Sequence, residues 1–395
     1  RYPTYYMTSF PPALVLKGSF GLSPKGRQLR NALIGVQYVA SFGLIIGATF
    51  MYLQNYYMQN TPLGYDKDEI IITNMNNNIR KSRDAFASQV KSFSGIEEVT
   101  YAEMLLSSQD QYMGWGRKYR DKDIQFQCLP VEPSFLKVMN VKISEGRDFR
   151  EEDKAKRYGT FVFNERARTE YGLEIGSLID SMEIVGFMPD VKFASFRTEV
   201  TPMAFFVWGT NNWGNQPNYA YIKVKAGSDL RGAMQHVKTT LQSFDPEYPF
   251  NVRFFDEVFN GLYEKERSLS SLITLFSLIA IFISVVGVFG LVVFDSEYRK
   301  KEIGIRKVLG STTEEIIVMF NKTYIRILCV CFVLGAPIAG YVVHRWLENF
   351  AYKTPMYWWV YLIAFAIIAV ITILTVTFQN WRAANENPVH SIKNE

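Results

Sequence analysis

The sequence predicts an α+β membrane protein with four transmembrane helices and one large domain outside the membrane. Four long apolar runs lie near 31–53, 269–294, 324–347 and 356–378, and a helix of about 20 residues crosses the hydrocarbon core of a bilayer. The long segment between the first two runs is polar enough to bring the mean hydropathy of the chain down to -0.02. That segment therefore folds in water.

Basic residues indicate the orientation. The segment before the first run contains Lys and Arg but no acid, and the 296–323 loop contains six further Lys and Arg residues. An excess of Lys and Arg in short loops marks the cytoplasmic side, so we expect the domain at about 55–267 outside the cytoplasm. Basic runs also bind nucleic acid, but these lie against the membrane ends, so no nucleic-acid partner is expected.

The outer domain reads as two strand-helix-strand units. Branched or alternating runs predict strands at 69–73, 99–103, 124–128, 219–225 and 251–255, and amphipathic runs predict helices at 81–93 and 229–244. We expect βαβ halves at about 66–149 and 216–260 to form one α+β layer. Residues at about 150–215 then form an inserted, mostly β subdomain.

The chemistry does not favour an enzyme. The three histidines lie on three separate elements, and the chain contains neither G-x-S-x-G nor GxxxxGK[ST]. An acidic run at 151–153 beside Arg147 and Arg150 has the charge to hold a cation, but we expect a solvated charged loop. We therefore predict no catalytic residues, no metal site and no cofactor.

Aromatic residues of the outer domain have two interpretations. They form either a protein contact surface or, as we favour, part of the core and loop anchors. The residues concerned are Tyr112, Trp115, Tyr119, Trp208 and Trp213.

The predicted spans lack groups that carry a solute. No Asp, Glu or Lys lies in the middle of a span, and Gln37 is the one strongly polar side chain that we identify well inside a helix. Small residues such as Gly43, Gly47 and Gly287 are expected to allow close helix packing.

The 296–323 loop contains a short amphipathic helix. Glu302 and Arg306 stand four residues apart and so lie on one face. An apolar stripe lies beside them, at Ile305, Val308 and Leu309. This helix either anchors the loop at the membrane surface or docks on a partner.

Signals at the end of this helix predict where the next one begins. Gly310 ends the first helix. A capping box for the second is offered by Ser311 with Glu314 or by Thr312 with Glu315.

The loop sequence RKKEIGIRKVLGS at 299–311 resembles the signature loop of FtsX/MacB-like ABC transporter permeases, especially the multi-span Bacteroidetes-type members. Further segments agree with that family: LGYD at 63–66, EGRDF at 145–149, FNE at 163–165 with Gly172, IVG at 184–186 with Asp190, and PV at 388–389.

The resemblance implies a mechanical transducer with an outer domain of the MacB periplasmic-core type. Its loop helix docks on a separate cytoplasmic ABC ATPase, and it acts in export or extraction of peptides, lipoproteins or other envelope substrates. The implied location is the bacterial inner (plasma) membrane, multi-pass. Implied partners are membrane lipid, a second four-helix unit in a dimer or pseudo-dimer, and a periplasmic adaptor or substrate protein. The implied ATPase-coupling residues are Glu302, Ile303, Gly304, Ile305, Arg306, Lys307, Val308, Leu309 and Gly310.

The resemblance also divides the chain. The expected parts are a cytoplasmic segment at 1–30, a first span at 31–54, the outer domain at 55–267, an FtsX-like domain at 268–380 and a cytoplasmic tail at 381–395. Within the FtsX-like domain we expect helices at about 268–295, 324–347 and 356–379.

Residues 1–20 resemble the tail of an earlier repeat. The segment at 9–17 parallels that at 385–393, with Pro12 over Pro388 and Lys17 over Lys393. We therefore expect the chain to be the C-terminal half of a longer permease. A function from another class stays open: a membrane-anchored sensor or receptor whose outer domain binds a ligand.

Overall fold

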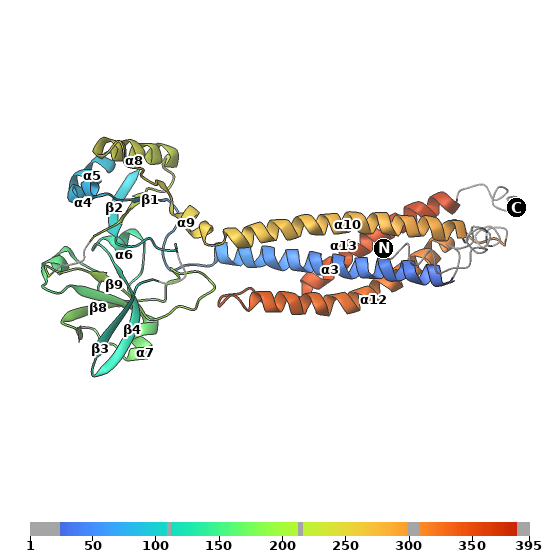
Figure 1. Ribbon diagram of the computed structural model, residues 1–395, viewed down its shortest axis with the longest axis horizontal. Coiled ribbons are helices and arrows are strands. Elements are labelled where there is room, and N and C mark those ends of the chain that lie inside the picture. The colour runs from blue at the N-terminus through green and yellow to red at the C-terminus, as the bar shows by residue number, and fades with distance from the viewer. Residues whose placement is uncertain (1–23, 109–111, 212–215, 299–305, 307–308, 385–395) are drawn as a thin grey trace, which may run out of the picture. The chain divides into compact units, whose positions relative to one another are not determined.

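The computed structural model describes residues 24–108, 112–211, 216–298, 306 and 309–384 (Figure 1). The chain divides into two compact units. A helical unit contains the chain up to Tyr56, Glu266–Glu348 and the part from Thr354 onward. An outer unit contains Tyr57–Lys265 and Asn349–Lys353.

Four long helices run side by side in the helical unit (Figure 1). They are α3 (Pro24–Asn60), α10 (Glu264–Tyr298), α12 (Thr313–Leu347) and α13 (Trp358–Ala384). All four contain a stretch long and apolar enough to cross a membrane, which confirms the four predicted spans. The structure carries α10 as far as Tyr298 and begins α12 at Thr313, so both helices extend into the segment that the sequence assigned to the loop.

Each helix buries one stripe and leaves the rest apolar and exposed, as expected for a bundle surrounded by lipid. On α12 the buried residues recur every three or four positions: Ile316, Phe320, Tyr324, Leu328, Cys331, Gly335, Ala339, Val343 and Leu347. Phe42 of α3 packs in the centre of the bundle, 5.2 Å from the ring of Phe332 and 6.4 Å from that of Phe365.

The small residues of the bundle do not all act as the sequence predicted. A Cβ added to Gly287 would lie 2.7 Å from Oε1 of Gln37, and one added to Gly335 would lie 3.4 Å from the Cα of Val39. A Cβ at Gly43 or Gly47 would meet nothing within 4 Å. The small-xxx-small pair on α3 therefore does not make the close contact expected of it, because its glycines face away from the described neighbours.

The first sheet of the outer unit interleaves two distant segments. Its order is β11-β1-β10-β2, with every neighbouring pair antiparallel. Its strands are β1 (Ile70–Asn74), β2 (Ile96–Ala102), β10 (Tyr219–Val224) and β11 (Arg253–Phe254). The two predicted strand-helix-strand units thus share one sheet, since β10 lies between β1 and β2.

Three helices share a core with this sheet: α4 (Asn77–Lys81), α5 (Arg83–Val90) and α8 (Leu230–Phe244). Caps set two of their starts. The Asn76 side chain accepts a hydrogen bond from the Ile79 amide, and the Asp229 side chain accepts one from the Gly232 amide. The helix predicted at 81–93 corresponds to α5, which ends at Val90, and Ser82 separates it from α4, which the sequence did not predict.

The second sheet is the β-rich part, with order β3-β4-β9-β6-β8-β5 and β7 paired to β8. Its strands are β3 (Gly114–Tyr119), β4 (Lys122–Pro130), β5 (Glu145–Gly146), β6 (Thr160–Asn164), β7 (Leu178–Ile179), β8 (Met182–Met188) and β9 (Met203–Val207). It therefore begins before residue 150, where the sequence placed its start. Strand β4 pairs with its neighbour β3 on one side and, on the other, with β9, which lies far along the chain, so local pattern assigned β4 to the wrong sheet.

Short helices complete the outer unit. They are α6 (Phe135–Val138), the 3-10 helix η2 (Glu151–Ala155), α7 (Glu165–Tyr171) and α9 (Phe255–Gly261).

Candidate functional site

The described end of the 296–323 loop is a turn at Leu309 and Gly310, which is followed at once by helix α12. The Ser311 amide donates to the Arg306 carbonyl at 2.9 Å, across a Gly310 with φ of 94°. A left-handed residue with a bond back over five residues is the usual helix C-terminal motif. Glycine adopts this φ without the clash that a Cβ brings.

The capping box at the start of α12 forms on Thr312 and Glu315, the second of the two predicted pairs. The Thr312 amide donates to the Glu315 carboxylate at 3.1 Å, and the Glu315 amide donates to the Thr312 hydroxyl at 3.3 Å. Glu314 and Glu315 also place negative charge in the first turn, where the helix dipole favours it.

Of the nine predicted coupling residues, three lie in the described part of the chain. Leu309 has 79% of its side chain exposed, and Arg306 is exposed beside it. Gly310 forms the turn described above. The other six lie outside the described residues: Glu302, Ile303, Gly304, Ile305, Lys307 and Val308.

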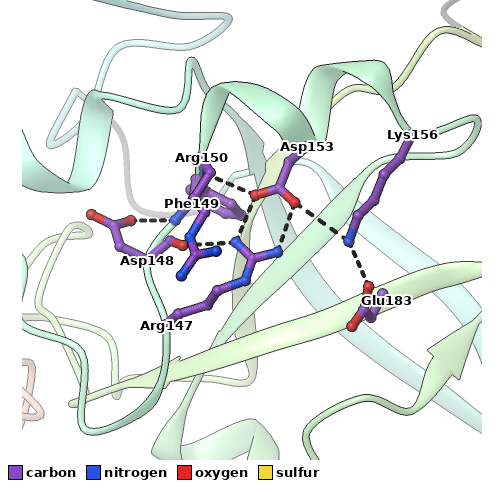
Figure 2. Close-up of polar contacts among 7 residues, drawn as sticks. All are labelled: Arg147, Asp148, Phe149, Arg150, Asp153, Lys156 and Glu183. Atoms are coloured by element: carbon purple, nitrogen blue, oxygen red, sulfur yellow. Dashed lines mark hydrogen bonds and ion pairs between the residues drawn. The ribbon is translucent and has the colours of Figure 1, made fainter.

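The charged segment at 147–153 is an ordered cluster (Figure 2). The Asp153 carboxylate is 1% exposed and accepts two bonds of 2.8 Å from the Arg147 guanidinium. It also accepts the Arg150 amide at 2.8 Å and lies 3.4 Å from Nζ of Lys156. The expectation of a solvated loop is therefore wrong for Asp153, because η2 turns this side chain inward.

The electrostatics of the cluster keep Asp153 ionised. Burial by itself raises the pKa of a carboxyl group. The hydrogen bonds from Arg147 and from the Arg150 amide outweigh burial, so the pKa of Asp153 lies below its ordinary value. These donors occupy the carboxylate oxygens, and no group of three metal-ligating side chains occurs among the described residues. The cluster holds the turn after β5 in place.

The aromatic side chains of the outer unit pack inside it. Tyr112 is 7% exposed and Tyr119 4%. Trp115 lies 5.3 Å from the ring of Phe206 and 5.9 Å from that of Trp208. Four of the five aromatic residues thus follow the core interpretation, and the fifth, Trp213, lies outside the described residues.

Neutral polar pairs join the helices of the bundle, which the sequence analysis did not identify. Ser41 and Ser284 share a hydrogen bond of 2.9 Å, which joins α3 to α10. The Tyr38 hydroxyl bonds Thr372 at 3.0 Å, which joins α3 to α13. In the sequence, these pairs are indicated only by hydroxyl side chains at positions that helical periodicity places on the buried face of a span. A cavity of about 10 Å³ lies beside these pairs.

Two family models match the chain. A MacB-like periplasmic core domain matches residues 34–240, and an FtsX-like permease C-terminal domain matches residues 274–388.

Curated relatives include the protein named "Macrolide export ATP-binding/permease protein MacB" from Chromobacterium violaceum. It is 23% identical over 230 residues, which cover 55% of this chain and 35% of the relative. The protein of the same name from Escherichia coli K12 is 22% identical over 233 residues, with the same coverage. The aligned part therefore spans about a third of the length of these relatives.

Solved structures include the periplasmic region of MacB from Actinobacillus actinomycetemcomitans, with 13% identity and a TM-score of 0.36. That match covers 51% of this chain and 95% of the other. A domain of a putative permease from Porphyromonas gingivalis has 16% identity and a TM-score of 0.32 and covers 48% of this chain and 91% of its own.

Proposed function

Since the chain belongs to the permeases that combine a MacB-like periplasmic core domain with an FtsX-like C-terminal domain, we propose that it is the non-catalytic membrane subunit of an ABC transporter. It passes ATP-driven movement from a separate cytoplasmic ATPase to the outer domain. No solute passes between its helices.

The observation that carries this proposal is the chemistry of the bundle interior. The pairs between α3 and its neighbours are neutral hydroxyl pairs, Ser41 with Ser284 and Tyr38 with Thr372. The cavity beside them, at about 10 Å³, has room for about one water molecule. Proton relays and ion pathways use charged or readily protonated side chains inside the membrane, and the residues that line this cavity include no Asp, Glu, His, Lys or Arg.

We place the coupling surface on the loop helix that the sequence predicts before Gly310. Leu309 is an exposed apolar side chain beside the exposed Arg306, on the side of the membrane that the basic residues assign to the cytoplasm. An apolar stripe on a short helix fits a groove in a partner protein. We assign the ATPase contact to the nine residues at 302–310.

The remaining assignments follow from the same function. The protein resides in the inner membrane of a bacterium as a dimer or pseudo-dimer of four-helix units, and its outer domain acts on peptides, lipoproteins or other envelope substrates, directly or with a periplasmic adaptor. The relatives described above are named as macrolide exporters. We do not assign macrolides as the substrate of this chain.

The test is co-purification of the tagged full-length protein with its ATPase, followed by ATPase assays in lipid nanodiscs. Leu309→Asp and Glu302→Lys are expected to abolish ATPase binding or its stimulation while the protein still inserts. Leu178→Asp is the matched control, since Leu178 of the outer unit is also exposed, at 61%. If both loop variants bind and stimulate the ATPase like the wild type, the loop helix is a membrane anchor. Co-purification of a signalling protein without an ATPase would favour the sensor instead.

A further inference from the structure

Three tyrosines of the outer unit lie where the chain passes to and from the long helices. Tyr57 is the first residue of the outer unit and belongs to the last turn of α3. Tyr263 immediately precedes α10. Tyr352 lies in Asn349–Lys353, the short segment between α12 and α13 that belongs to the outer unit.

The rings of these tyrosines meet at one side chain, Phe196. Its ring centroid lies 6.2 Å from that of Tyr57, 6.3 Å from that of Tyr263 and 5.9 Å from that of Tyr352. All three pairs are edge-to-face, with interplanar angles of 82°, 68° and 79°, an arrangement that aromatic rings favour. Phe196 is 1% exposed.

The backbone of Phe196 is held by two of the same tyrosines. Its amide donates to the Tyr263 hydroxyl at 2.8 Å, and its carbonyl accepts from the Tyr352 amide at 3.1 Å. A third bond of 3.2 Å runs from the Val200 amide to the Tyr352 hydroxyl. A phenylalanine in an ordinary core has only apolar contacts. Phe196 is also held in position and orientation by hydrogen bonds to segments that lead into the long helices.

A cation reinforces the contact with Tyr352. Nζ of Lys192 lies 5.1 Å from the centre of the Tyr352 ring and 6.0 Å from that of Phe196, within the range of a cation–π interaction.

The segment that carries Phe196 belongs to the second sheet of the outer unit and is hydrogen-bonded to the chain that follows β2 of the first. Residues 189–202 connect β8 to β9, two strands of the second sheet. Phe193 lies in this segment, and its carbonyl accepts bonds from the Tyr112 hydroxyl at 2.9 Å and the Ser107 amide at 3.1 Å. Ser107 follows β2 of the first sheet. Phe196 thus lies on the segment that enters β9 and that contacts the residues after β2 through Phe193.

We propose that Phe196 is the joint at which movements of all four long helices converge on the outer domain. Tyr57, Tyr263 and Tyr352 are the positioning residues through which the helix movements reach Phe196. The proposal rests on the proposed function, since it locates the transmission that this function requires.

The experiment uses the full chain with its ATPase in nanodiscs and measures hydrogen–deuterium exchange with and without a non-hydrolysable ATP analogue. In the wild type, nucleotide is expected to change exchange in residues 189–207. Phe196→Leu and Tyr352→Ala are expected to lose that change while ATPase binding and hydrolysis persist. Tyr352→Ala carries the test if Phe196→Leu does not fold, because Tyr352 is only half-buried.

Phe86→Leu is the matched control. Phe86 is 0% exposed and makes an edge-to-face pair with Phe244, but it lies in the core of the first sheet, and a structural defect of equal size there should leave the nucleotide response intact. The proposal is overturned if the response keeps its wild-type size in Tyr352→Ala and in any folded Phe196→Leu, or disappears equally in Phe86→Leu. Absence of any ATPase, or of any nucleotide response in the wild-type outer domain, would instead refute the proposed function, and the joint with it.

Discussion

Replacing Arg147 with alanine tests whether the Asp153 cluster stabilises the outer domain. Arg147 donates two charge-assisted hydrogen bonds to Asp153, and removing one partner of a buried ion pair costs roughly 3–5 kcal/mol. The Arg147 side chain is 29% exposed, and Asp153 keeps the Arg150 amide as a donor and Lys156 as an ion-pair partner. The partial exposure of Arg147 and the remaining partners of Asp153 both favour the lower end of this energy range. We therefore expect Arg147→Ala to lower the free energy of unfolding by about 3 kcal/mol.

The single buried thiol of the outer domain provides the assay. Cys128 of β4 is 0% exposed, and burial raises the pKa of its thiol, so it reacts with a thiol reagent only when the sheet opens. Replacing Cys329 and Cys331 with alanine leaves Cys128 as the reporter, because the chain has three cysteines. A loss of about 3 kcal/mol lowers the temperature midpoint of labelling by roughly 6–12 °C for a domain of this size.

The control is Arg120→Ala. Arg120 also pairs with a carboxylate, that of Glu174, but the two side chains are 60% and 62% exposed, and an exposed ion pair contributes little to stability because water screens it. Equal midpoints for Arg147→Ala and Arg120→Ala would refute the argument from burial.

Three further predictions concern pH, topology and packing. Because the folded-state pKa of Asp153 is lowered, its stabilisation is complete above the ordinary carboxyl pKa of about 3.9 and is lost as pH falls through the lower folded-state value. The gap between the thermal-unfolding midpoints of wild type and Asp153→Asn, followed by circular dichroism, should thus shrink with acid, and a constant gap would contradict this. Cysteines placed in 60–260 should react with an impermeant reagent from outside and those in 299–315 should not; the reverse pattern would invert the orientation. Gly335→Leu should reduce transport activity and thermal stability because the helix α3 backbone lies against it, whereas Gly43→Leu should resemble wild type, and equal damage in the two variants would be evidence against this packing.

The parts predicted well from the sequence are those set by local pattern. Span number follows from the length of apolar runs, and the Thr312 cap follows from a spacing of three residues. The cluster around Asp153 could not be predicted, because Glu151, Glu152 and Asp153 carry the same charge and only the turn of η2 decides which one is buried.

Contacts between segments that are distant in the sequence could not be predicted from local sequence patterns either. Tyr57, Tyr263 and Tyr352 stand far apart along the chain, and nothing in their neighbours indicates that they share Phe196. The extent of the β-rich part was missed for the same reason, since the strand that joins the β3–β4 hairpin to the rest of the second sheet is β9, which comes after residue 200.

The interleaved first sheet also has a consequence for the order in which the protein folds during synthesis. Ile70 of β1 pairs with Lys223 of β10, so β1 has no neighbour in its sheet until roughly 150 more residues have been made, which takes about 10–30 s at ordinary translation rates. All strands of the second sheet, from β3 to β9, precede β10 in the sequence. This sheet is therefore fully synthesised before β10. We therefore expect the β-rich part to form first and the enclosing sheet to close last, with β1 and β2 as unpaired edges in need of protection during that interval.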